Sequence, residues 1–267
     1  MALSHLLILA LIQGITEFLP VSSSGHLILL PHLTGLQDQG QTLDVAVHVG
    51  TLLAVVIYFR SDVKLAGAGL SRLARGKLDT QGAVWALNLI VATLPVIAAG
   101  YALHALGLTQ ALRSIAVIGW AMLVFGIVLY WVDQKASTSR HASDWALRDA
   151  LIMGCAQAIA LIPGTSRSGI TITAGRGLGY DRESAARLAM LMSIPTILAS
   201  GVLLGMDVAQ EADLATARDG AIAAALAFVA ALGALSLMMR LLKSVSFTPY
   251  VIYRIILGVI LLIIAYS

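Results

Sequence analysis

The sequence is short of charge and almost without cysteine. Of its 267 residues only 12% are charged, with 14 acidic and 17 basic side chains. A soluble domain carries about 25% charged residues, because its surface must face water. The hydrophobic fraction of 59% excludes a disordered chain. The single cysteine, Cys155, excludes a disulfide framework and a multi-cysteine metal cluster. The basic residues form no run, so nucleic acid is not expected as a partner.

What the chain has instead is long apolar stretches. A membrane-spanning helix needs about 20 mostly apolar residues. Six stretches meet this requirement, at about 43–59, 83–105, 113–132, 184–206, 219–239 and 250–266. The sequence therefore predicts an all-α integral membrane protein, with residues 1–267 forming a single membrane domain.

Two further apolar stretches, 1–34 and 150–180, are interrupted in the middle. The breaks are polar and rich in glycine, proline and serine, at 20–25 and 163–169. Irregular backbone at membrane depth is tolerated only where it is buried in protein or lines a cavity. Each stretch is therefore predicted to form two half-length helices joined by a turn, that is, a re-entrant helical hairpin.

The charged connections predict an orientation. Basic residues are concentrated in connections on the cytoplasmic side of a membrane. The connections 60–82, 133–149 and 240–249 hold five, three and two Lys or Arg residues and are assigned to the cytoplasm, whereas 207–218 is acidic and is assigned to the outside with 35–42 and 106–112. Both termini then lie outside, and the two hairpins enter the membrane from opposite sides.

The two hairpins also resemble each other in sequence. Gln, Ile and Gly recur at a constant offset of 144 residues, in the pairs Gln13 and Gln157, Ile15 and Ile159, and Gly25 and Gly169. Each hairpin is followed by three predicted spans. We therefore predict an inverted-topology repeat of about 1–132 and 148–267. Such repeats place the functional site at their interface near the midplane.

The first hairpin concentrates polar groups that can act on an anion. Gln13 and Glu17 are four residues apart and share one face of the first half-helix. Ser22, Ser23, Ser24 and Gly25 precede the second half-helix, whose N-terminus is an anion-binding site. His26 can carry protons near neutral pH or attack as a nucleophile.

The second hairpin supplies the complement. Arg167 offers a fork of donors that matches two phosphate oxygens, and hydroxyl groups surround it at Thr165, Ser166, Ser168 and Thr171. Together these groups fit hydrolysis of a phosphate ester or anhydride. A structural alternative stays open for each serine, because hydroxyl groups in membrane helices often bind backbone. His48 and His104, inside predicted spans, are interpreted as packing or hydrogen-bonded residues.

With these motifs in view, the chain resembles the undecaprenyl-diphosphate phosphatase family of the bacitracin-resistance type. The resemblance rests on Gln13 and Glu17, the run 18–26 (FLPVSSSGH) and the run 163–171 (PGTSRSGIT). It covers essentially the whole chain. Two positions depart from some members: Gln13 replaces a carboxylate and Ser24 replaces a threonine.

The resemblance implies hydrolysis of undecaprenyl diphosphate to undecaprenyl phosphate and inorganic phosphate. This reaction recycles the lipid carrier for peptidoglycan synthesis and confers bacitracin resistance. It also implies a multi-pass protein of the bacterial plasma (inner) membrane, with its active site toward the periplasmic or outer face. A divalent cation, Mg²⁺ or Ca²⁺, would assist, with Gln13 and Glu17 as ligands, although the missing carboxylate at Gln13 puts a paired-carboxylate site in doubt.

The hypothesis for the site follows from both arguments. The expected catalytic residues are Glu17, Ser23, His26 and Arg167, and the expected phosphate-binding residues are Ser22, Ser24, Gly25, Thr165, Ser166, Ser168 and Thr171. The nucleophile is left open between Ser23, His26 and a water activated by Glu17. The rival function is a membrane carrier (flippase) for undecaprenyl phosphate or a small anion, and a homodimer is also left open.

Overall fold

The computed structural model describes residues 3–34, 40–108, 112–208 and 214–267. Within these ranges the chain forms eleven α-helices, one short 3₁₀ turn and no β-strand. The prediction of an all-α fold is confirmed. The apolar composition favours helices here because a helix satisfies its own backbone hydrogen bonds where water is absent.

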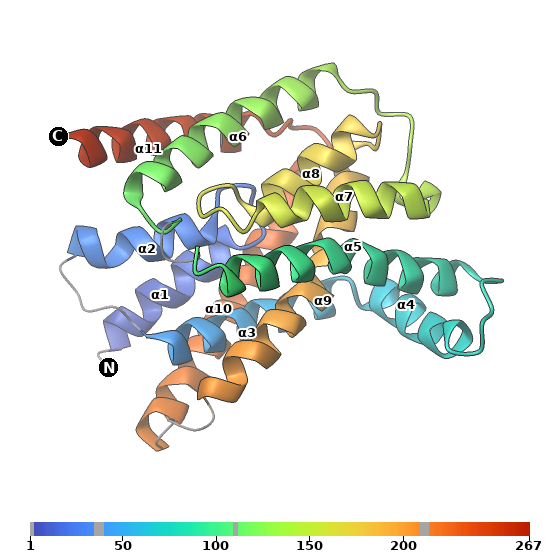
Figure 1. The fold of residues 1–267 in the computed structure, drawn as a ribbon, viewed down its shortest axis with the longest axis horizontal. Helices are drawn as coiled ribbons and strands as arrows, with labels where there is room; N and C mark the ends of the chain where they lie inside the picture. Colours follow the sequence, from blue (N-terminus) through green and yellow to red (C-terminus); the bar gives the residue numbers. More distant parts are fainter. Residues whose placement is uncertain (1–2, 35–39, 109–111, 209–213) are drawn as a thin grey trace.

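Each interrupted stretch forms two short helices. The first gives α1 (Leu3–Thr16) and α2 (Ser23–Thr34), and the second gives α7 (Leu147–Ile159) and α8 (Arg167–Gly177). All four are shorter than the 20 or so residues of a full span. The two hairpins enter from opposite ends of the molecule, and their turns meet near its middle (Figure 1). Their re-entrant placement in a membrane stays a prediction.

Five long helices have the length and apolar character of membrane spans: α5 (Gln81–Ala105), α6 (Ile115–Lys135), α9 (Arg182–Val208), α10 (Leu214–Leu241) and α11 (Thr248–Tyr266). A sixth is obtained if α3 (Gln41–Tyr58) and α4 (Arg60–Leu73) count as one span bent by 90°. The structure thus agrees with the six predicted stretches. Helix α4 was not predicted, because its basic residues mark 60–82 as a connection.

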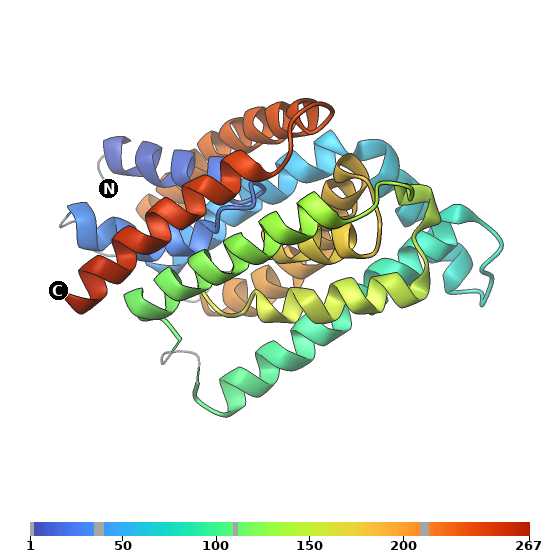
Figure 2. The ribbon, with the colours of Figure 1, turned by 90° about the horizontal axis from the view of Figure 1, so that it is seen from above.

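The packing of the helices follows a similar pattern in the two halves of the chain. Helix α1 packs against α10 while α7 packs against α5, and α6 runs beside α11 (Figures 1 and 2). Small residues allow close approach: a Cβ on Gly14 would lie 2.6 Å from Ala230 Cβ, and one on Gly154 would lie 2.5 Å from the Ala92 carbonyl. An inverted repeat predicts this pairing; its boundaries at 1–132 and 148–267 stay a prediction.

The ends of the molecule differ in which connections they hold. The links at 74–80 and 136–146 lie toward one end of the long axis, the link at 242–247 lies nearer the middle, and the first turn of α1 and the last turn of α11 lie at the other end (Figure 1). Two of the three connections assigned to the cytoplasm therefore share one end of the molecule. The connections assigned to the outside fall partly beyond the described residues, at 35–39, 109–111 and 209–213.

Candidate active site

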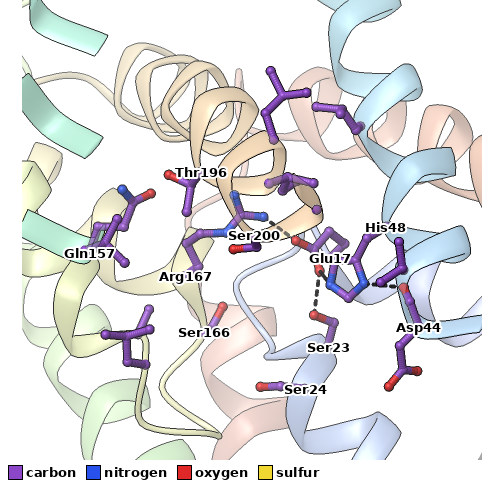
Figure 3. A pocket seen from close by; sticks show the side chains of 18 of the residues that line it. Glu17, Ser23, Ser24, Asp44, His48, Gln157, Ser166, Arg167, Thr196 and Ser200 are labelled. Carbon is purple, nitrogen blue, oxygen red and sulfur yellow. Dashed lines mark hydrogen bonds and ion pairs between the residues drawn. The ribbon is translucent and has the colours of Figure 1, made fainter. Parts of the chain in front are cut away.

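Glu17 is the centre of the polar contacts between the two hairpins. It follows α1 directly and is buried. Its Oε2 atom accepts hydrogen bonds from Gln13 Nε2 at 2.9 Å and from Ser23 Oγ at 2.6 Å. Its Oε1 atom forms an ion pair with Arg167 Nη2 (Figure 3). The carboxylate therefore joins the first hairpin to the second.

Arg167 is the first residue of α8 and keeps part of its guanidinium available. Its Nη2 atom binds Glu17, whereas its Nη1 atom is buried with no hydrogen-bond partner among the described residues. A buried donor without a partner is costly. Because the Arg167 side chain lines the cavity described next, an anion bound there could satisfy this donor.

A cavity of about 490 Å³ opens beside the two hairpin turns. Its polar lining is contributed by Glu17, Ser22, Ser23, Ser24, Asp44, His48, Gln157, Ser166, Arg167, Thr196 and Ser200 (Figure 3). The rest is apolar and comes chiefly from α3, α5 and α9, through Val45, Val49, Leu52, Val96, Leu161, Ile197 and Leu198. Val49 and Leu198 are also 43% and 51% exposed, so the apolar wall continues to the outer surface of the helical bundle.

His48 lines this cavity, where its place inside an apolar span predicted only a packing or hydrogen-bonded residue. Its Nε2 atom lies 3.9 Å from Glu17 Oε2. Its Nδ1 atom lies 2.7 Å from the Asp44 carbonyl oxygen, to which an Nδ1–H donates. That bond leaves Nε2 facing the carboxylate. The signal in the sequence was the spacing of Asp44 and His48, which puts two polar residues on one face of an apolar helix.

Gln157, which in the sequence stands out only as the repeat partner of Gln13, is a second residue of the cavity wall. It lines the cavity and is fully buried. Its Nε2 atom donates to the Ala92 carbonyl at 3.4 Å, and its Oε1 atom has no partner among the described residues. A buried amide oxygen without a partner in a cavity wall is suited to accept a hydrogen bond from a ligand or water.

The structure does not bring His26 into the cavity with the other predicted catalytic residues. Its Nδ1 atom lies 2.6 Å from the Ser22 carbonyl oxygen and its Nε2 atom 2.5 Å from Tyr253 Oη. The ring stacks on that of Tyr253, with centroids 5.7 Å apart. Both nitrogens are thus engaged away from Glu17. A direct catalytic role for His26 stays a prediction that this geometry does not support.

The predicted phosphate-binding residues divide into two groups. Ser22, Ser24 and Ser166 line the cavity. The remaining ones, Gly25, Thr165, Ser168 and Thr171, do not. The hydroxyl of Ser168 donates to the Leu19 carbonyl at 2.9 Å, and that of Thr171 donates to the Arg167 carbonyl at 2.7 Å. These two hydroxyls hold backbone in place, as the structural alternative anticipated.

The residues here do not by themselves fit a bound divalent cation. Hard cations take six or more oxygen ligands, mostly carboxylates, carbonyls and waters. Both oxygens of Glu17 are already engaged, one of them with a cation, Arg167. The amide oxygens without a partner are those of Gln13 and Gln157, and the described residues contain no cluster of three His, Cys, Asp or Glu that could hold a metal. The predicted Mg²⁺ or Ca²⁺ stays a prediction, and no catalytic step is assigned to it.

Comparison with known proteins places this arrangement in a family. Proteins named undecaprenyl-diphosphatase from Roseobacter denitrificans, Jannaschia sp. and Ruegeria pomeroyi are each 68% identical over 267 residues, covering all of both chains. A protein of the same name from Hahella chejuensis is 43% identical over 261 residues. The family described as "Bacitracin resistance protein BacA" matches residues 6–260. The chain therefore belongs to the bacitracin resistance protein BacA family.

Proposed function

We propose that this protein is an undecaprenyl-diphosphate phosphatase of a bacterial membrane. It hydrolyses undecaprenyl diphosphate to undecaprenyl phosphate and inorganic phosphate, which returns the carrier lipid to cell-wall synthesis and confers bacitracin resistance. Two relatives that are 68% identical to this chain over their full length are named undecaprenyl-diphosphatase. The membership in the BacA family points the same way.

One observation carries the proposal at the level of geometry. A single cavity combines a polar end, built by Glu17, Ser23 and Arg167, with an apolar wall that reaches the outer surface of the bundle at Val49 and Leu198. A polyprenyl diphosphate has the same division into a charged head and an apolar chain. The diphosphate fits the polar end and the prenyl chain fits the wall, with its remainder in lipid.

The contacts of Ser23 favour it as the nucleophile. Its hydroxyl already donates to Glu17 at 2.6 Å, the arrangement of a nucleophile with a general base. Ser23 Oγ attacks the terminal phosphorus and its proton passes to Glu17, which gives it to the departing undecaprenyl phosphate as the bridging P–O bond breaks. Water then attacks the phosphoserine and passes one proton to Glu17, which returns it to Ser23 Oγ as the P–Oγ bond breaks and inorganic phosphate leaves. Arg167 neutralises the phosphate throughout.

Two other nucleophiles, water and His26, can be distinguished from Ser23 by experiment. Direct attack by water activated by Glu17 uses the same residues without a phosphoserine. Attack by His26 requires the ring to leave Tyr253 and turn toward the cavity. A phosphoenzyme trapped by acid quench and digested to peptides separates the three: label on Ser23, label on His26, or no label.

The active site is proposed to face the outer side of the membrane. The links at 74–80 and 136–146 lie toward one end of the molecule, and the Lys and Arg residues of the connections 60–82 and 133–149 assign that end to the cytoplasm by the positive-inside rule. The first hairpin, which supplies Glu17 and Ser23, enters from the opposite end. A membrane-impermeant thiol reagent applied to whole cells tests this with cysteines placed at Ser24 and, as a cytoplasmic control, at Lys77.

A membrane carrier for undecaprenyl phosphate or a small anion is the second candidate. Two opposed hairpins around a central polar cavity are also the marks of secondary transporters. A carrier needs the arginine and the hydroxyl groups, but not a serine hydrogen-bonded to a carboxylate.

The deciding experiment is phosphate release by the purified, detergent-solubilised protein from undecaprenyl diphosphate. The proposal predicts catalytic release that is abolished in Ser23→Ala and retained in Ser71→Ala, a matched exposed serine on α4. Binding of the lipid without release would favour the carrier. Release that survives Ser23→Ala would exclude Ser23 as the nucleophile while leaving the phosphatase activity in place.

A further inference from the structure

Arg254 is a buried cation without an acid partner. It lies in α11 and its side chain is fully buried. Among the described residues its guanidinium contacts no carboxylate; every hydrogen bond that it makes goes to a backbone carbonyl. Burial of an isolated charge away from water is expensive. A charged residue kept in such a place suggests a role beyond filling space.

The carbonyls that Arg254 binds come from both hairpin turns. Nη1 donates to the carbonyl of Pro20 at 3.4 Å, in the first turn. Nη2 donates to those of Gly164 at 3.1 Å and Thr165 at 2.8 Å, in the second turn. Further bonds from Nε and Nη2 reach two α6 carbonyls, at Met122 and Ala121. One side chain thus connects the two turns to each other and to the long helix beside them.

Resting on the proposed function, we propose that Arg254 is a positioning residue for catalysis. It sets the turn that carries Glu17 and Ser23 against the turn that carries Arg167. Pro20 is three residues from both Glu17 and Ser23, and Thr165 is two residues before Arg167. The ion pair between Glu17 and Arg167 joins the turns at the cavity, and Arg254 joins them from the buried side.

The shape of arginine explains why this residue suits the position. Broken helices leave carbonyls without partners in their turns, and a planar fork of five donors can bind carbonyls in several directions at once. Lysine, with a compact head, cannot span the same set. The local packing also leaves little freedom, because a Cβ on Gly169 would lie 2.8 Å from Arg254 Nη1.

Arg254 also places positive charge close to the anion site. The contact with Gly169 puts the guanidinium against the first turn of α8, the helix that begins at Arg167. The N-terminus of a helix already favours an anion. A fixed cation beside it adds to that potential without touching the substrate.

The test compares Arg254→Lys with Arg176→Lys. Arg176 is a matched control, since it is equally buried and binds carbonyls at Ser137 and Ala136, but it pairs with Asp133 and lies at the far end of α8. We expect kcat for phosphate release to fall about a hundredfold in Arg254→Lys, the cost of a misplacement of about 1 Å. KM should change little, and Arg176→Lys should keep its kcat. Equal losses in the two variants, or a wild-type kcat in Arg254→Lys, would overturn the proposal.

A second pair of variants moves Arg254 without removing it. A Cβ on Gly126 would lie 3.3 Å from Arg254 Cβ, whereas one on Gly119, on the same helix, would meet Leu262 of α11 instead. Gly126→Ala should lower kcat and Gly119→Ala should not. If both lower it alike, general disturbance of the α6–α11 contact explains the loss and the positioning role fails.

A readout independent of turnover separates this proposal from the proposed function. Amide hydrogen exchange should accelerate in 17–24 and 160–168 together in Arg254→Lys, and in neither segment in Arg176→Lys. If the wild-type protein releases no phosphate, the proposed function is wrong, and the exchange result still decides whether Arg254 holds the turns. Unchanged exchange in both turns would contradict the proposal.

Discussion

Ser22 and Ser166 share a positive φ angle at positions 144 residues apart. Their φ angles are 73° and 70°, and they are the two non-glycine residues with positive φ in the described chain. Each precedes a half-helix, and each Oγ accepts a hydrogen bond from the backbone N–H three residues on, Gly25 and Gly169. The offset is the one at which Gln13 and Gln157 match. The two turns are therefore built on one local plan.

This strained conformation predicts how the second turn responds to substitution. A left-handed backbone costs a residue with a Cβ about 1–2 kcal/mol, and a β-branched one more. Ser166→Gly should hold its unfolding temperature close to that of the wild type, since relief of strain offsets the lost cap. Ser166→Val should lower it by several degrees. Thermal unfolding in detergent measures both, and a Val variant as stable as the Gly variant would contradict the assigned turn geometry.

Substitutions in the serine run should separate chemistry from binding. Ser23 donates to Glu17, whereas Ser24 lines the cavity without contacting the carboxylate. We expect Ser23→Ala to lower kcat by at least about a thousandfold, as loss of a nucleophile does. Ser24→Ala should alter KM within about tenfold, the worth of a hydrogen bond to a charged group. Steady-state kinetics of phosphate release tests this, and the reverse pattern would move the nucleophile to Ser24.

His48 should matter to turnover although its sequence context is that of a packing residue. Its Nε2 atom faces Glu17 at 3.9 Å inside the cavity. We predict that His48→Ala lowers kcat/KM by about fivefold, because an ion pair made by a partly exposed side chain contributes about 1 kcal/mol. His48→Gln should recover most of it, because an amide can replace one ring nitrogen. His104→Ala, in the last turn of α5 and outside the cavity, is the control. An equal loss of kcat/KM in this variant would show that the effect of His48→Ala does not depend on its position beside Glu17.

Asp181, which caps the N-terminus of α9, should make the stability of the protein fall in acid. Burial opposes ionisation of Asp181, but hydrogen bonds from the Ser184 backbone and hydroxyl and from His141 outweigh it, so its pKa lies below the usual 3.8. Because the pKa of Asp181 is lowered in the folded state, its ionised carboxylate stabilises the fold fully above pH 3.8. This stabilisation is lost as the pH falls through the lowered pKa. An N-cap of this kind contributes about 1 kcal/mol.

The corresponding measurement compares thermal unfolding of the wild type and Asp181→Ala across pH. The gap between them should be full at pH 7 and should close below pH 3.8. Glu183→Ala, two residues on and exposed, should show a small gap that does not close. A gap for Asp181→Ala that persists unchanged in strong acid would show that the carboxylate is not the stabilising group.

Much of the architecture follows from local sequence, because a membrane leaves few solutions. Apolar length predicted the spans, and the interruptions near Pro20 and Pro163 predicted the hairpins. The side-chain partners were less accessible. His26 stands in the motif beside Ser23, yet its ring is hydrogen-bonded to Tyr253, 227 residues later. His48 and Arg254 stand on apolar helices whose sequence does not reveal what faces them, since that depends on how distant helices pack.

Glu17 and Arg167 work as one unit in the proposed site, although 150 residues separate them in sequence. A double-mutant cycle on kcat/KM with Glu17→Gln, Arg167→Gln and the double variant tests it most directly. Groups that act together are strongly non-additive. We predict that each single variant loses most of the activity and that the double variant is little worse than the poorer single one. Losses that simply multiply in the double variant would contradict a shared site.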